Sequence, residues 1–276
     1  SIYKQSGQIS DLKNTIVQNL PDGEIGIGHT RWSTHGPPTD ENAHPHTAES
    51  ERVAVVHNGI IENYEELKSD LRARGHEFES DTDTEVIPHL IEGYMDEGAD
   101  AREAFERTID SLEGSYATVA LVEGHEKLLA TRQDSPLVLG QQNGEYYLAS
   151  DVPAFLEFTN QVSYLEDGDV AEVSAEGATI TDADGEEVSR DVETVEWDPE
   201  ETGKGAYDHF MLKEIDSQPE SLRKTIQGRV DPEAGEVTLD ALEEADLEGV
   251  EQVHLVACGT SYHAAMFGSN LMNRRG

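Results

Sequence analysis

The sequence has one cysteine and few basic side chains, and both shortages limit what the protein can be. Cys258 alone excludes an internal disulfide and fits a reducing compartment, so we expect a cytoplasmic protein. Nineteen Lys and Arg against 58 Asp and Glu give a net charge of −39. This balance argues against a nucleic-acid partner, because phosphate contacts need Lys and Arg. No apolar run approaches the ~20 residues that span a bilayer, and no signal peptide is recognisable, so we expect no membrane partner.

The acidic residues are spread along the whole chain rather than gathered in a tail. Even spacing is typical of a solvated acidic shell, as in halophilic proteins from a salt-rich cytoplasm. Disorder is excluded because apolar segments recur throughout. The 276 residues leave room for one large domain, or for one domain and part of a second.

Five of the eleven histidines lie between Gly28 and Gly59. An apolar segment from Val53 ends in His57-Asn58-Gly59, which places an imidazole, an amide and a bare backbone N–H at one edge. Arg31 adds a planar guanidinium that can bind a carboxylate through two parallel hydrogen bonds. These groups are suited to holding an amino acid and stabilising an oxyanion. The same stretch has no nucleophile stronger than a hydroxyl.

Two other interpretations of the histidines were weighed. A metal site is disfavoured because His44-Pro-His46 lacks the i,i+4 spacing of a helical zinc motif and no carboxylate pattern completes it. We therefore predict no metal and no cofactor. Single histidines can also simply satisfy backbone groups between strands. That interpretation is weaker for the whole stretch, because Arg31, Asn58 and Gly59 belong to the same pattern.

The periodicity predicts helices early in the chain and strands after them. A short strand is expected over 25–29 and a buried one over 53–57. Helices are expected over 10–20, 63–74, 101–112 and, after the capping segment 80–85, from Val86 to Ile91. Hairpin-like strands are expected over 116–122, 127–132, 137–140, 146–149, 162–165, 170–174 and 178–181. This order favours a layered α+β fold with helices against antiparallel sheets.

A polar, glycine-bearing stretch from Asp198 to Gly205 is the best boundary in the chain. Beyond it we expect a helix over 208–225, a buried strand over 253–257 and a helix from Tyr262. The turn Cys258-Gly-Thr-Ser261 lies between this strand and the last helix. An α/β domain uses a turn at this place to present N–H groups to a phosphate. An ordinary strand–helix turn would look the same.

Several motifs together resemble the glutamine–fructose-6-phosphate aminotransferase family. The glutaminase signatures are His29-Thr-Arg-Trp-Ser-Thr-His35, Asn42-Ala-His-Pro-His46, His57-Asn-Gly-Ile-Ile-Glu-Asn63 and Thr82-Asp-Thr-Glu85. Lys213-Glu-Ile215 with Gln218-Pro219 matches the helix entering the isomerase half, and Cys258-Gly-Thr-Ser261 matches its first phosphosugar-binding turn.

The resemblance implies a four-layer αββα N-terminal-nucleophile hydrolase fold of the class II amidotransferases. This domain would span 1–197 and be incomplete at its N-terminus. A linker over 198–207 would follow, and then the truncated start of an α/β sugar isomerase (SIS) domain over 208–276.

The resemblance also implies the residues that act. Asn58 and the N–H of Gly59 would form the oxyanion hole, and Thr260 with Ser261 would hold the phosphate of fructose 6-phosphate. The glutamine-binding residues would be Arg31 for the α-carboxylate, Asp83 for the α-ammonium, and Trp32, Thr34 and His35 for the pocket wall.

The implied enzyme transfers ammonia from glutamine to fructose 6-phosphate, yielding glucosamine 6-phosphate and glutamate, as a homodimer through its SIS domains. Its nucleophile would be an N-terminal cysteine upstream of Ser1. Cys258 belongs to the phosphate turn and cannot replace it, so residues 1–276 alone are expected to be inactive. An amidotransferase with another acceptor, and a glutamine-binding module without activity, are the alternatives. The Lys213–Ile215 helix and the phosphosugar turn favour the sugar acceptor.

Overall fold

The computed structural model divides the chain into two compact units, Ser1–Gly203 and Lys204–Gly276. It describes residues 1–16, 23–31, 36–196, 207–226, 229–231, 236–237 and 252–275. Almost all of the linker expected over 198–207 lies outside these ranges. Each unit is therefore described by itself.

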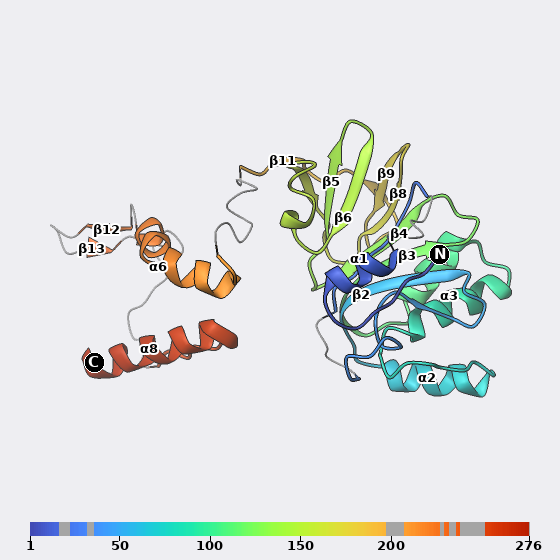
Figure 1. Ribbon diagram of the computed structural model, residues 1–276, viewed down its shortest axis with the longest axis horizontal. Helices are drawn as coiled ribbons and strands as arrows, with labels where there is room; N and C mark the ends of the chain where they lie inside the picture. The colour runs from blue at the N-terminus through green and yellow to red at the C-terminus, as the bar shows by residue number, and fades with distance from the viewer. Residues whose placement is uncertain are drawn as a thin grey trace. The chain divides into compact units, whose positions relative to one another are not determined.

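Two antiparallel sheets form the centre of the first unit (Figure 1). The larger has the strand order β1-β2-β3-β4-β8-β9-β10 and the smaller β11-β7-β5-β6. The strands of the larger sheet are β1 (His46–Thr47), β2 (Val53–Ile61), β3 (Gly114–Val122), β4 (Leu128–Gln133), β8 (Val170–Ser174), β9 (Gly177–Thr181) and β10 (Glu187–Val188). The smaller sheet contains β5 (Val138–Gln142), β6 (Glu145–Ala149), β7 (Gln161–Tyr164) and β11 (Glu193–Thr194).

Helices cover one face of the larger sheet. They are α2 (Tyr64–Ala73), α3 (Val86–Asp96) and α4 (Ala101–Ile109). Their apolar faces close a core with β2 and β3 in which Phe105, Ile61 and Ile87 are fully buried. Burying such side chains stabilises the fold by about 1.5–3 kcal/mol each. In Figure 1, α2 and α3 lie on one side of the β2–β3 pair, and β5 and β6 lie on the other.

A second core fills the space between the two sheets. Leu139 of β5 packs there with Val119 of β3 and Ala171 of β8. The outer face of the smaller sheet is covered by a short 3-10 helix, η1 (Val152–Ala154), and the turn after it, whose Phe155 ring lies against Gly140. The layering confirms the expected α+β fold with helices against antiparallel sheets.

Two expectations in this unit were wrong. Strand β2 does not end at His57, as expected, but continues to Ile61, because β3 pairs with it along its whole length. Residues 25–29 form no strand, since no described strand pairs with them to satisfy their N–H and C=O groups. The first helix, α1 (Ile9–Ile16), occupies the first part of the range expected over 10–20, whose last four residues lie outside the described ranges.

The second unit contains two long helices, α6 (Phe210–Ile226) and α8 (Gly259–Arg275), and a hairpin of β12 (Val230–Asp231) and β13 (Glu236–Val237). The strand expected over 253–257 is not formed: no described strand lies beside this segment to share a ladder. Helix α8 begins at Gly259, three residues earlier than expected. Among the described helices of both units, none combines the length and apolarity required for a membrane crossing.

Candidate functional site

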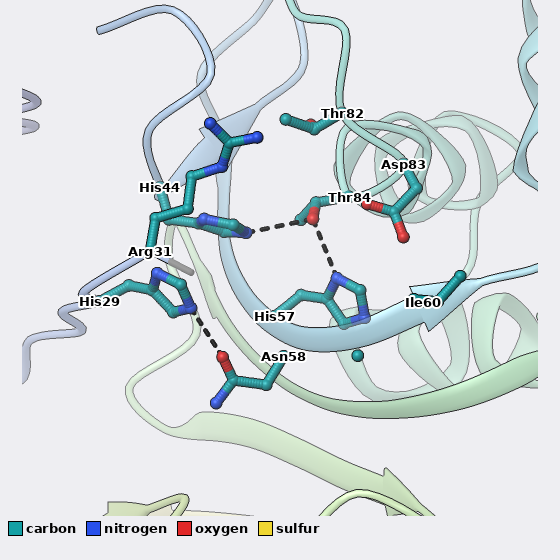
Figure 2. Close-up of a pocket in the computed structure, with 10 residues that line it drawn as sticks. His29, Arg31, His44, His57, Asn58, Ile60, Thr82, Asp83 and Thr84 are labelled. Carbon is teal, nitrogen blue, oxygen red and sulfur yellow. Dashed lines mark hydrogen bonds between the residues drawn. The ribbon is translucent and has the colours of Figure 1, made fainter. Parts of the chain in front are cut away.

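A cavity of about 290 Å³ opens beside strand β2 in the first unit. Four chain segments contribute to it: residues 29–31, His44, the second half of β2, and the stretch before α3 (Figure 2). The lining is mostly polar or ionisable, and consists of His29, Arg31, His44, His57, Asn58, Gly59, Ile60, Thr82, Asp83 and Thr84.

The cavity exists because one edge of β2 is only partly paired. Strand β1 pairs with β2 at Ala54 and Val55, whereas β3 pairs along the whole strand. The edge beyond Val55 is therefore open to other groups. The N–H of Ile61 uses it to donate to Oδ2 of Asp83 at 2.9 Å, which fixes this buried carboxylate against the strand. Alternation along an antiparallel strand directs the N–H of Gly59 to the same edge.

Position 59 accepts only glycine. Its φ is +118°, a conformation that side chains rarely adopt, and a Cβ there would collide with the carbonyl oxygen of Ser115 on the neighbouring strand. Glycine therefore lets β2 pass close to β3 while exposing a bare backbone at the cavity.

Thr84 links two histidines of the cavity wall. Its Oγ1 lies 3.1 Å from Nε2 of His44 and 2.9 Å from Nδ1 of His57. Burial, reinforced by the neighbouring His29, holds the pKa of His44 far below its ordinary value. The His44 ring is therefore neutral at physiological pH.

His46 lies behind this wall and contacts the same stretch of chain. Its Nε2 is 3.2 Å from Oγ1 of Thr82. Burial and the ammonium of Lys4 lower the pKa of His46 to about 3. This ring is neutral too, so hydrogen bonds rather than charge hold the segment before α3 against β1.

His29 orients the amide of Asn58. Its Nε2 lies 2.8 Å from Oδ1 of Asn58, and burial lowers the pKa of the imidazole. A neutral ring with its proton on Nε2 donates to that oxygen. The amide then keeps its NH2 group as a donor for another acceptor.

The guanidinium of Arg31 is held by the loop that follows it. Nη1 donates to the carbonyl of Pro37 at 2.8 Å, and Nη2 donates to that of Gly36 at 3.1 Å. Asn42 also donates to the Pro37 carbonyl and accepts the N–H of Asp81, so the loop is tied to the stretch carrying Asp83. These contacts fix the place of the guanidinium at the cavity.

The predicted site residues are only partly brought together. Arg31, Asn58, Gly59 and Asp83 line the same cavity. Trp32, Thr34 and His35 lie outside the described residues. Thr260 and Ser261 are exposed in the first turn of α8 in the second unit.

Several residues that line the cavity were not predicted from the sequence to have a role in it. Thr82 and Thr84 flank Asp83, and His44 lies inside the second histidine motif. The signal for them was present, since all three belong to the motifs quoted above. Spacing alone did not show that the Thr84 hydroxyl joins two imidazoles from different segments.

Comparisons with known proteins all find similarity to enzymes that act on glutamine. The family model described as "Glutamine amidotransferase domain" matches residues 29–157. The chain is 49% identical over 273 residues to a glutamine–fructose-6-phosphate aminotransferase [isomerizing] of Halobacterium salinarum, covering 99% of this chain and 45% of that protein. Proteins with the same name from Symbiobacterium thermophilum and Thermus thermophilus are 48% and 47% identical, covering 99% and 98% of this chain and 45% and 44% of their own lengths. The chain thus spans less than half the length of these curated relatives.

Among solved structures, a glutamine phosphoribosylpyrophosphate amidotransferase from B. subtilis matches with a TM-score of 0.45 and 25% identity. The match covers 56% of this chain and 34% of that one.

Proposed function

Since the chain belongs to the glutamine amidotransferase family that includes the glutamine–fructose-6-phosphate aminotransferases, we propose that its first unit binds glutamine and releases ammonia from it. The observation that carries this proposal is the convergence of Arg31, Asn58, Gly59 and Asp83 on one cavity. The cavity presents one cation, one anion and two neutral hydrogen-bond donors. The two charged groups match the charged ends of glutamine, and the two donors match its amide carbonyl.

Arg31 and Asp83 would hold the amino-acid end. The guanidinium of Arg31 would take the α-carboxylate, and the loop carbonyls that fix the group would keep it aimed. Asp83, which accepts the N–H of Ile61, would pair with the α-ammonium. Trp32, Thr34 and His35 would complete the wall, as the resemblance implies.

Asn58 and Gly59 would act on the reacting carbonyl. In the proposed reaction a thiolate adds to the side-chain amide carbon, and the oxyanion accepts hydrogen bonds from the NH2 of Asn58 and the N–H of Gly59. The intermediate collapses to a thioester as its NH2 group takes up the proton that the thiol gave up and leaves as ammonia. Water then hydrolyses the thioester to glutamate and restores the thiol. One such donor is worth about 3 kcal/mol to the transition state. The thiol implied by the resemblance is that of an N-terminal cysteine.

The destination of the ammonia is proposed from the relatives' name. Fructose 6-phosphate would be the acceptor, with Thr260 and Ser261 at the start of α8 taking its phosphate through hydroxyl and helix N–H groups. We assign residues 1–197 to the glutaminase, 198–207 to a linker and 208–276 to the beginning of a SIS domain. A cytoplasmic homodimer joined by SIS domains, without nucleic-acid or membrane partners, completes the proposal.

The test uses the protein as expressed from its natural gene, with glutamate release followed at saturating and limiting glutamine. Asn58→Ala is expected to lower kcat by about 100- to 1,000-fold. Arg31→Lys keeps the charge but loses the fork, so it should mainly raise KM. Asn160→Ala, an exposed asparagine outside the cavity, is the matched control.

Unchanged kcat/KM in both Asn58→Ala and Arg31→Lys would contradict the site assignment. If the protein hydrolyses glutamine but forms no amino sugar when fructose 6-phosphate is present, the proposed acceptor is wrong. The glutaminase proposal would still stand in that case.

A further inference from the structure

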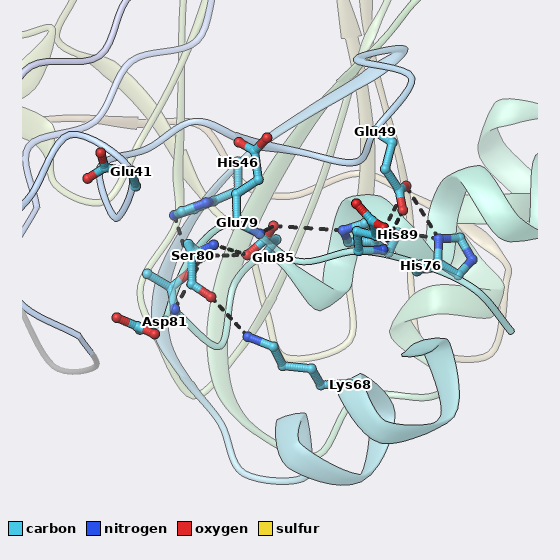
Figure 3. Close-up of polar contacts among 12 residues, drawn as sticks. Glu41, His46, Glu49, Lys68, His76, Glu79, Ser80, Asp81, Glu85 and His89 are labelled. Carbon is cyan, nitrogen blue, oxygen red and sulfur yellow. Dashed lines mark hydrogen bonds and ion pairs between the residues drawn. The ribbon is translucent and has the colours of Figure 1, made fainter. Parts of the chain in front are cut away.

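A compact group of Glu49, His76 and His89 lies in the first unit outside the cavity lining (Figure 3). Glu49 comes from the turn between β1 and β2, His76 follows the end of α2, and His89 belongs to the first turn of α3. The expectation of no metal rested on the histidine stretch between Gly28 and Gly59, which contains neither His76 nor His89.

The three side chains present their donor atoms to one point. Nδ1 of His89 lies 3.1 Å from Nδ1 of His76 and 3.3 Å from Oε2 of Glu49, and the last two atoms are 3.5 Å apart. In a tetrahedral zinc site with bonds of about 2.0–2.1 Å, neighbouring ligand atoms are about 3.3–3.4 Å apart. The triangle therefore has the edge lengths of one face of such a site.

With both imidazoles neutral, the three contacts cannot all be hydrogen bonds at once, because at most one proton lies on each Nδ1. Two ring nitrogens facing each other share one proton at best, and that hydrogen bond leaves the carboxylate oxygen opposed to a lone pair. A cation at the common point would accept all three lone pairs. Two imidazoles with one carboxylate suit Zn²⁺, whereas Mg²⁺ and Ca²⁺ prefer oxygen ligands throughout.

The surroundings hold each donor in place. Oε1 of Glu49 accepts the N–H of Glu77 at 2.6 Å, which leaves Oε2 for the group. The His89 ring is 99% buried, packs against Phe78 with 4.3 Å between ring centroids, and turns Nε2 toward Oε1 of Glu85 at 3.8 Å.

The carboxylate of Glu85 is itself anchored. Its oxygens accept hydrogen bonds from the N–H of Glu79 at 2.7 Å, from the N–H of Ser80 at 2.8 Å and from the Ser80 hydroxyl at 2.5 Å. A histidine that binds a metal through one nitrogen commonly directs the other to a carboxylate.

We propose that Glu49, His76 and His89 form a Zn²⁺ site that fastens the β1–β2 turn and the end of α2 to α3. Glu49 and His76 are partly exposed, so the fourth position faces solvent and water fills it. The site lies beside the stretch that carries Asp83 but contributes no ligand to the glutamine cavity. Its role is structural, and it stands independently of the proposed glutaminase chemistry.

The test titrates Zn²⁺ into the metal-stripped full chain against a chromophoric chelator, in about 1 M salt so that the acidic surface is screened. We expect one tight site that raises Tm, two imidazole ligands by X-ray absorption, and tetrahedral visible bands when Co²⁺ is the probe. His76→Gln and Glu49→Gln should each weaken binding at least about 10-fold. Both positions are partly exposed, and Gln at 49 can still accept the N–H of Glu77, so both variants should fold.

The matched control is His125→Gln. His125 is also a partly buried histidine beside a carboxylate, with 3.5 Å to Glu172, but has no second imidazole. The proposal is overturned if His125→Gln loses as much affinity as His76→Gln. It is equally overturned if no ion binds more tightly to the parent chain than to His76→Gln, or if X-ray absorption shows oxygen ligands only.

Discussion

The two units of the chain contain similar apolar residues but use them differently. In the first unit Phe105 of α4 is fully buried in the core between helices and sheet. In the second, Phe267 of α8 is 69% exposed and Val256 is 94% exposed. Apolar composition is therefore no measure of a core; burial requires a second layer that presents a matching face.

The difference follows from what each unit pairs. In the first unit the larger sheet packs against helices on one face and against the smaller sheet on the other. Its strands therefore pair their backbone groups and bury their side chains at the same time. The described part of the second unit has two long helices and one hairpin of two-residue strands. Hydrophobic burial consequently contributes much to the first unit and little within the described part of the second.

The largest expected effect comes from two matched phenylalanines. Phe105→Ala should lower the free energy of unfolding by about 3–5 kcal/mol, because it leaves a cavity in a closed core. Phe267→Ala should change it by no more than about 0.5 kcal/mol, as for exposed positions. Urea denaturation of both variants measures the contrast. An equal loss in both would show that α8 is packed in solution and that the two units do not differ.

A backbone position gives the next effect. Gly59→Ala should cost about 3 kcal/mol, because it adds both strain at positive φ and a collision with the strand beside it. Gly98→Ala is the control, since φ there is +106° but no atom lies within 4 Å of the added Cβ. It isolates the strain and should cost about 1–2 kcal/mol. Equal losses by thermal denaturation would remove the close approach as the reason for glycine at position 59.

The contrast between local pattern and the need for a neighbouring layer also explains what could be predicted from the sequence. Strands such as β8 and β9 were predicted almost to the residue, because apolar periodicity and turn residues act locally. The strand expected over 253–257 failed, since a strand also needs a neighbour that the local pattern does not contain. In the site, Arg31, Asn58, Gly59 and Asp83 were selected from motifs and do line one cavity. The Thr84 bridge and the Glu49–His76–His89 group depend on contacts across 13 to 40 residues, which spacing does not encode.

Buried histidines should make the first unit sensitive to acid. His44 and His46 stay neutral in the folded protein, with the pKa of His46 at about 3, whereas an unfolded histidine has a pKa of about 6.5. Below pH 6.5 the unfolded chain therefore binds more protons, so stability is complete above that pH and falls toward pH 3. The two histidines together should cost up to about 2–3 kcal/mol per pH unit.

Glu85 adds to this loss at lower pH, because its folded pKa of about 2 lies below the model-peptide value of 4.5. Urea denaturation at pH 7, 6 and 5 measures how the free energy of unfolding changes with pH. His46→Gln removes one of the groups that take up a proton on unfolding, so it should reduce this slope by the contribution of one proton. A slope that His46→Gln leaves unchanged would mean that His46 is not held neutral.

The smallest effect compares one polar contact from each unit. The Asp100 side chain caps α4 by accepting the N–H of Glu103 at 2.9 Å, so Asp100→Ala should cost about 1 kcal/mol. Glu220 and Lys224 form an exposed ion pair of 3.3 Å on α6, and Glu220→Gln should cost about 0.3 kcal/mol or less, decreasing with salt. The cap satisfies a backbone N–H that has no partner within its helix, whereas the ion pair only replaces hydration. Denaturation at low and high salt separates them, and a salt-dependent loss for Asp100→Ala would show that charge, not the cap, provides its effect.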